Sequence, residues 1–284
     1  MPISLPAWRS TACLLTQSQY WGWPSTASAM HRAELFGGEF LYCDYRQFTR
    51  LASLQEMPMP GGHQAMREPW RNTYAHLARC FDWQQCRRRF ADLDIVQFLN
   101  AKPLKTLDAM LAGKINSPFT SSCGRSFDAF AAALGLCRDR TSYEGQAAIA
   151  LEALAAPVYH QQQAAYPVAM RKGAQLWRLY WRPFWEALLA DLQAGVDKPL
   201  IAARIHRGVA NAVVAMAVKL SQRTGCRTVI LSGGVFQNAL LLEQVSVSLR
   251  RREFTVLSPE HLPANDGGLS LGQAVVAAAR SLVR

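Results

Sequence analysis

The segment TVILSGGVFQN, residues 228–238, combines residue types that can hold a phosphate or a ribose. Its apolar run Val229–Leu231 predicts a buried strand. Gly233 and Gly234 follow, and because they lack a Cβ, a ligand can approach their backbone closely. The N–H groups of the helix expected next favour negative charge. The segment therefore predicts a phosphate- or ribose-binding turn, although strand–glycine–helix turns also form for packing alone.

Further polar residues stand at predicted helix entrances. The Asn238 amide can cap the helix that follows or hydrogen-bond a base or ribose. In SSCGRSFDAF the helix begins around Gly124, and Asp128 lies in its first turns. There the carboxylate can stabilise the helix dipole or bind a ligand. Ser-Tyr-Glu-Gly, ending at Gly145, opens another helix over 146–155.

The elements that must position these residues alternate between strand and helix. A strand at 229–231 leads to a helix at 239–250, a strand at 254–257 and a final Ala-rich helix. This order predicts an α/β layer with a mostly parallel sheet. Asp266 lies at a strand-to-helix junction, where ligand sites gather in such sheets.

The rest of the chain supplies support. From residue 37, partly alternating apolar and polar residues predict one or two strands, and helical patterns occupy much of 65–117. A long helix is expected over 199–223, with His206 beside its apolar face as a packing residue. Residues 1–36 show neither a helical nor an alternating period, so we expect poor order there.

Composition limits the class of protein. With 284 residues, 50% of them hydrophobic, the chain can bury a substantial core in one large or two modest domains. No run of about eighteen apolar residues or secretory pattern is present, so no membrane partner is expected. Seven irregularly spaced cysteines favour reduced thiols and a cytoplasmic location. The net charge of +11 is thinly spread, which makes nucleic-acid binding the less favoured interpretation.

Three separated motifs together resemble one known family. SSCGRSFDAFAAALGL followed by SYEG, then SGGVFQNALL, then PANDGGLSLGQA are similar to the C-terminal part of the hydrogenase maturation carbamoyltransferases, the HypF family. GGEFLYCDYRQFTRL and MPGGHQAMREPWR also look like this family, so the resemblance covers residues 37–284. It implies a TsaD-like α/β fold of the actin/Hsp70/sugar-kinase class, here incomplete and with added helices.

The resemblance also assigns roles to residues. Asp128 and Gly145 would hold a nucleotide ribose, and Asn238 would line the adenylate site together with the glycines before it. Asp266 would be a ligand of a divalent metal, whether zinc, iron or magnesium. The full set of nucleotide-binding residues implied in this way is Gly124, Asp128, Gly145, Gly233, Gly234 and Asn238.

The family's reaction supplies the expected chemistry. Carbamoyl phosphate and ATP yield a carbamoyl-adenylate, whose carbamoyl group passes to the C-terminal cysteine of a thiol-bearing, HypE-like partner. This step leads to the cyanide ligands of nickel–iron hydrogenase. A metal and backbone dipoles would neutralise the leaving phosphate while the thiolate attacks the carbonyl.

The sequence also departs from the family pattern. The acylphosphatase-like, zinc-finger and YrdC-like domains and the histidine pair of the metal site are not found in it, and Asp266 by itself is a poor metal site. If the gene is read one nucleotide earlier, residues 1–10 can spell HAHIASCLAE and residues 23–37 can spell LAFDGIGYAPGGTLW, which match segments of the family. The hypothesis is therefore a frameshifted, internally started remnant that is inactive alone, with residues 1–36 disordered or out of frame.

Two other functions stay open at this point. The chain could be a non-catalytic nucleotide-binding or partner-docking module. It could also be a relative of the tRNA threonylcarbamoyltransferases, which its basic charge would suit. The SYEG and DGGLSLGQ motifs favour the hydrogenase branch.

Overall fold

A seven-stranded sheet forms the centre of the computed structural model, which describes residues 12–16, 34–35, 37–45, 47–261 and 263–281. The strand order is β10-β9-β1-β3-β4-β8-β7. The bounds are β1 (Ala12–Thr16), β3 (Glu39–Cys43), β4 (Phe48–Leu54), β7 (Ala169–Lys172), β8 (Trp177–Tyr180), β9 (Thr228–Leu231) and β10 (Thr255–Leu257). A second, three-stranded sheet has the order β2-β6-β5, with β2 (Glu34–Leu35), β5 (Met57–Pro58) and β6 (Phe119–Thr120).

The large sheet is mixed, whereas the sequence predicts a mostly parallel one. Strands β10, β9 and β1 are parallel neighbours, as the strand–helix–strand pattern at the C-terminal end requires. The pairs β1–β3, β3–β4 and β7–β8 are antiparallel. The difference arises because β3 and β4 are joined by a short loop at 44–47, which permits only antiparallel pairing.

The structure corrects the expectation of poor packing for part of residues 1–36. Ala12–Thr16 forms β1, which lies between β9 and β3 and pairs with both along its length. This segment of four apolar residues and a threonine is too short to show a period within the surrounding Trp, Ser and Gln residues. Its strand conformation is set by the open edges of its two neighbours. The rest of the predicted segment, apart from Glu34 and Leu35 of β2, lies outside the described residues.

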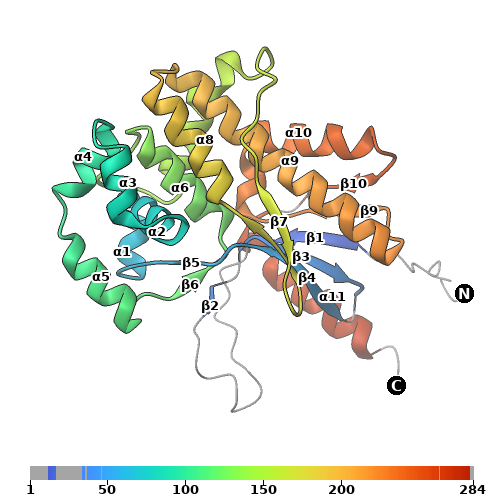
Figure 1. The fold of residues 1–284 in the computed structure, drawn as a ribbon. Coiled ribbons are helices and arrows are strands. Elements are labelled where there is room, and N and C mark those ends of the chain that lie inside the picture. The colour runs from blue at the N-terminus through green and yellow to red at the C-terminus, as the bar shows by residue number, and fades with distance from the viewer. Residues whose placement is uncertain (1–11, 17–33, 36, 46, 262, 282–284) are drawn as a thin grey trace, which may run out of the picture.

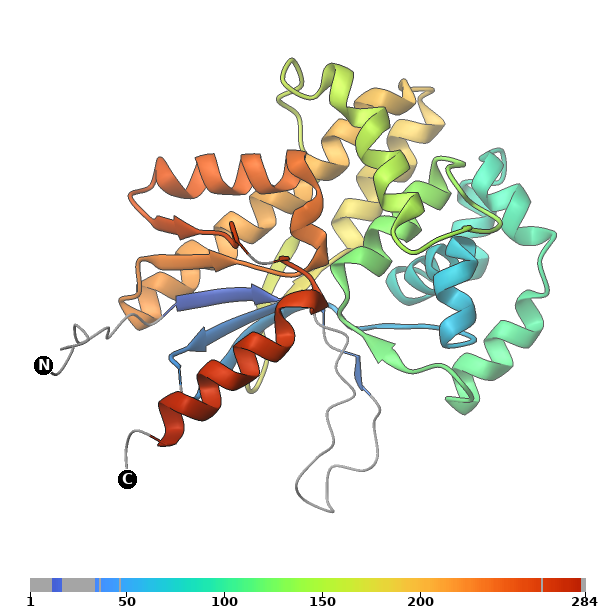
Figure 2. The ribbon, with the colours of Figure 1, turned by 180° about the vertical axis from the view of Figure 1, so that it is seen from behind.

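Helices cover both faces of the sheet and form a separate helical part beside it (Figures 1 and 2). On one face lie α9 (Lys198–Thr224) and α10 (Ala239–Arg250), and α11 (Leu269–Ser281) crosses the other. The remaining helices are α1 (His63–Arg67), α2 (Pro69–Cys80), α3 (Trp83–Arg89), α4 (Asp94–Asn100), α5 (Leu104–Gly113), α6 (Cys123–Ala133), α7 (Gln146–Ala155) and α8 (Arg182–Gln193). The helices predicted at 146–155, 199–223 and 239–250 are confirmed.

An aromatic cluster joins α2, α6 and α8. Phe130 stacks on Phe184 with ring centroids 4.5 Å apart and meets Trp185 at 5.2 Å. The Trp185 indole Nε1 donates a hydrogen bond to Nδ1 of the buried His76, 3.1 Å away. Burial lowers the pKa of His76 to about 3, so this ring is neutral at physiological pH.

Helix α9 is the longest element of the described chain and runs through the core. It is long and apolar enough to cross a membrane by composition, and 78% of its most apolar window is buried inside the fold. A core position explains this apolarity, because a helix covered on most sides must be hydrophobic around most of its circumference.

Two glycines allow β3 to approach the loop before α6. A Cβ built on Gly38 would lie 2.5 Å from the backbone oxygen of Ser121 and from Leu54 Cδ1, and one on Gly37 would lie 2.8 Å from Ser122 Cα. The backbone N–H of Cys123 donates to the Gly37 oxygen at 3.4 Å. The close contact between β3 and the start of α6 therefore requires residues without a side chain.

We predict that Gly38→Ala lowers the free energy of unfolding by about 2 kcal/mol, because the backbone carbonyl it meets cannot move aside. Gly272→Ala in α11 is the matched control. A Cβ there meets nothing within 4 Å, so the change is expected to leave stability unaltered or raise it by about 1 kcal/mol through helix propensity. Urea unfolding of both variants tests the pair, and equal stabilities would contradict the close approach.

Candidate nucleotide site

The turn after β9 is tied to the loop that carries Asp266. Gly233 has φ +105°, a conformation that favours glycine, and its N–H donates to the Ala264 oxygen at 2.6 Å. The Ser232 hydroxyl donates to the same oxygen at 3.4 Å. A 3₁₀ turn, η3 (Gly234–Gln237), then leads to α10, and η4 (Asp266–Gly268) leads to α11. The structure thus joins the two loops that the sequence singles out.

Asn238 is the N-cap of α10 and also binds α9. Its Oδ1 accepts from the Leu241 N–H at 2.9 Å, and its Nδ2 lies 3.0 Å from Nε2 of His206. Nδ1 of His206 lies 2.8 Å from the Ala202 oxygen and must donate to it, so Nε2 accepts from Asn238. Burial lowers the pKa of His206 to about 4, which keeps the ring neutral. The predicted cap and the predicted packing histidine are confirmed.

A carboxylate of the chain occupies the amino terminus of α10. Glu152 on α7 accepts hydrogen bonds from the backbone N–H groups of Ala239 and Leu240, at 2.6 and 3.3 Å. The sequence predicts that these N–H groups favour negative charge. In the structure a carboxylate of the same chain supplies that charge. No sequence motif surrounds Glu152, so its role as a cap of α10 could not be predicted. The role becomes visible in the structure, where α7 brings Glu152 to the start of α10.

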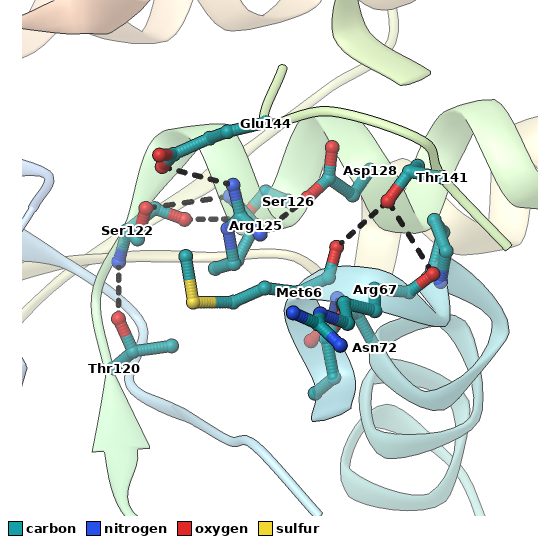
Figure 3. A network of polar contacts seen from close by, with 12 residues as sticks. Met66, Arg67, Asn72, Thr120, Ser122, Arg125, Ser126, Asp128, Thr141 and Glu144 are labelled. Atoms are coloured by element: carbon teal, nitrogen blue, oxygen red, sulfur yellow. Dashed lines mark hydrogen bonds and ion pairs between the residues drawn. The ribbon is translucent and has the colours of Figure 1, made fainter. Parts of the chain in front are cut away.

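Asp128 and Arg125 form a buried ion pair within α6. Arg125 Nη1 lies 2.9 Å from Asp128 Oδ2, and both residues are at least nine-tenths buried. Arg125 Nη2 also lies 3.9 Å from an oxygen of Glu144 in the SYEG motif (Figure 3). Burial raises the pKa of the Asp128 carboxyl, Arg125 opposes this shift, and Glu144 adds to it. Arg125 therefore links the two predicted motifs.

The glycines of these motifs shape the backbone around the ion pair. Gly145 has φ +82° and forms the N-cap of α7, which suits glycine. Gly124 is half-buried in the first turn of α6, and Ser122 caps that helix by accepting from the Arg125 N–H at 3.3 Å. A chain of contacts joins this region to Asn238, because Phe127, next to Asp128, meets the His206 ring at 5.1 Å.

A second buried carboxylate, on β3, could not be predicted from the sequence. Glu39 of β3 is 3% exposed and accepts hydrogen bonds from Ser121 and from Arg50, whose Nη2 lies 3.1 Å away. The contact ties β3 to the loop before α6. The alternating pattern of β3 gives no sign of a buried charge, since its partners lie on other segments.

Two cavities adjoin these groups. A small apolar cavity lies between the two glycines before β3 and the turn after β9, lined by Gly37, Gly38, Leu54, Cys123, Val213, Val235, Phe236 and Leu241. A larger cleft of about 610 Å³, here named the α1 cleft, is lined by His63, Met66, Arg67, Arg140, Thr141, Ser142, Tyr143 and Glu144. The second cavity has the size of a ligand site and contains most of the SYEG motif.

The described residues do not fit a metal centre. Within them, no group of three or more His, Cys, Asp or Glu side chains lies close enough to hold an ion. Asp266 has its backbone in η4, and its side chain lies outside the described part of the structure. Its predicted role as a metal ligand stays a prediction.

Comparison with known proteins identifies related sequences. A family model described as "Carbamoyltransferase, Kae1-like Domain, second subdomain" matches residues 32–273. Carbamoyltransferase HypF2 of Cupriavidus necator is 35% identical over 87% of this chain, and carbamoyltransferase HypF of Rhodobacter capsulatus is 37% identical over 87%. The chain spans 32% and 30% of the lengths of these two proteins.

Solved structures show the same fold. The crystal structure of full-length HypF in the phosphate- and nucleotide-bound form superposes with a TM-score of 0.81 and 30% identity, covering 94% of this chain and 33% of that one. T. kodakarensis HypF gives a TM-score of 0.73 at 24% identity over 94% of this chain and 34% of its own, and shows the fold alone. The predicted α/β fold is confirmed.

We predict that stability falls as the pH drops below the ordinary histidine pKa of 6.5, because His76 and His206 are neutral in the fold and charge on unfolding. The unfolded state then binds more protons, so each residue costs up to about 1.4 kcal/mol per pH unit until its folded pKa is reached. His206→Gln should reduce this slope, whereas His63→Gln, on an exposed residue, should leave it unchanged. Urea unfolding from about pH 7.5 to about pH 5 measures both.

Proposed function

The chain belongs to the HypF carbamoyltransferase family, and we propose that it binds an adenylate and serves in carbamoyl transfer to a thiol. The acceptor in this proposal is the C-terminal cysteine of a hydrogenase maturation partner. The donor is a carbamoyl-adenylate made from carbamoyl phosphate and ATP. The observation that carries the proposal is the pair of contacts that His206 makes on α9, with Asn238 at the start of α10 and with the ring of Phe127, the residue before Asp128 on α6.

The chemistry of the step sets what the site must do. The thiolate sulfur forms a bond to the carbamoyl carbon, and the bond from that carbon to the phosphate oxygen breaks, releasing AMP. The thiol proton passes to solvent. The protein has to orient the adenylate and favour the growing charge on the departing phosphate.

The groups of the site suit parts of a nucleotide. Glu144 has an exposed carboxylate on the α1 cleft, which can accept hydrogen bonds from ribose hydroxyls. Gly145 beside it leaves the backbone open to close approach. We assign Gly233, Gly234 and Asn238 to the adenine end, because Glu152 already supplies the negative charge at the start of α10. Divalent metal enters this proposal only through Asp266, and no step is assigned to it.

We expect the chain alone to bind nucleotide without completing the transfer, because its described residues do not form a metal centre. The test is to incubate the chain with carbamoyl phosphate, ATP, a divalent metal and the thiol-bearing partner, and to weigh the partner for a carbamoyl adduct. Adduct formation at the rate of a longer family member would contradict this expectation. Nucleotide binding without any effect on the partner, even when other family domains are added, would favour the docking-module alternative.

We predict that Asp128→Asn and Asn238→Ser weaken ATP binding about tenfold, since each removes one polar contact with the ligand. Serine at 238 keeps the helix cap but loses the hydrogen bond to His206, so unchanged melting temperatures of both variants must show that a loss of affinity is not a loss of folding. Asp92→Asn, on an exposed carboxylate between α3 and α4, is the matched control. Isothermal titration measures the three variants, and affinities equal to that of the unmodified chain would remove both residues from the site.

A further inference from the structure

The α1 cleft has two walls that are fixed to each other. The Thr141 N–H and hydroxyl both donate to the Arg67 oxygen, at 2.8 and 3.3 Å, and the hydroxyl also lies 3.2 Å from the Met66 oxygen (Figure 3). These bonds join the end of α1 to the loop before α7. Arg67 and Arg140 therefore stand on segments whose relative position is held by backbone contacts.

The charges next to Arg67 are already neutralised by other groups. Glu68 pairs with Arg71 and accepts from Gln64 Nε2 at 2.7 Å. Among the residues that the structure describes, the Arg67 side chain has no ion-pair or hydrogen-bond partner. Its positive charge is thus available to a ligand.

The same holds on the loop before α7, which supplies Arg140 to the lining. Arg138 pairs with Asp94 at 2.7 Å, and Asp139 pairs with Lys102 at 2.6 Å. Arg140, the next residue, has no such partner within the described part of the chain. Glu144, the one carboxylate in the lining, faces Arg125. The cleft therefore carries two unneutralised guanidinium groups.

The anion-binding position that the sequence predicts at the start of α10 is filled. Helix α10 begins at the predicted glycine turn, but Glu152 accepts from its first N–H groups. A phosphate group that approached there would meet a carboxylate at close range. The positive charge that a phosphate needs lies instead on the α1 cleft.

We propose that Arg67 and Arg140 form a phosphate subsite in the α1 cleft, next to Glu144. The fork of N–H donors on a guanidinium matches phosphate oxygens, and two such groups that line one cleft can hold one phosphate together. The phosphate belongs either to ATP or to a small acyl phosphate. This choice of compounds rests on the proposed function, whereas the cleft and its charge do not.

Binding of four probes to the full chain tests the subsite: inorganic phosphate, carbamoyl phosphate, ATP and adenosine. Arg67→Ala and Arg140→Ala should each weaken the phosphate-bearing probe that uses the subsite about tenfold, and the double variant more. Adenosine affinity should not change. Arg88→Ala, on an exposed arginine of α3, is the matched control, and unchanged melting temperatures show that the variants fold.

The outcomes separate the sources of the phosphate and the two proposals. Weaker ATP binding alone assigns the subsite to the nucleotide, and weaker inorganic phosphate and carbamoyl phosphate binding assigns it to the acyl phosphate. The subsite is overturned if the double variant and the unmodified chain bind all three phosphate-bearing probes with equal affinity. It is also overturned if the unmodified chain binds none of these three probes. Loss of phosphate binding in the double variant supports the subsite even if no carbamoyl transfer is ever detected.

Discussion

The hydrogen bond between Asn238 and His206 holds together the part of the molecule that resembles a ligand site. It fixes the start of α10 against the middle of α9, and the same Asn238 side chain closes the first turn of α10. His206 can accept this bond only as the neutral tautomer that donates to Ala202. A buried ring with both nitrogens satisfied leaves little freedom, so the glycine turn before Asn238 has one orientation relative to the core.

Around this bond, three carboxylates are each bound by donors of the same chain. Glu152 closes the start of α10, Asp128 is paired with Arg125 inside α6, and Glu39 is bound by Ser121 and Arg50. Each of these three carboxylates has a partner supplied by another element or another turn. In the lining of the α1 cleft, Arg67 and Arg140 have no ion-pair partner among the described residues, so this side of the site attracts anions.

Much of this arrangement could be predicted from the sequence because it depends on local patterns. The period of the 199–223 helix, the glycine turn after β9 and the cap at Asn238 are decided by residues close together in the chain. The position of β1 could not be predicted, since its five residues form a strand only where β9 and β3 leave both edges open. Glu152 and Glu39 acquire their roles from partners on segments far away in the sequence, and the proposed phosphate subsite depends on contacts between distant segments in the same way.

The apolarity of helix α9 also affects the chain before it folds and whenever it unfolds. An 18-residue window of this 27-residue helix is apolar enough to cross a membrane by composition, and the fold buries 78% of that window. A newly made or partly unfolded chain therefore presents a segment that chaperones, membranes and other unfolded chains can all capture. Variants that loosen the packing around α9 should be lost from the cell through aggregation or degradation before any defect in ligand binding matters.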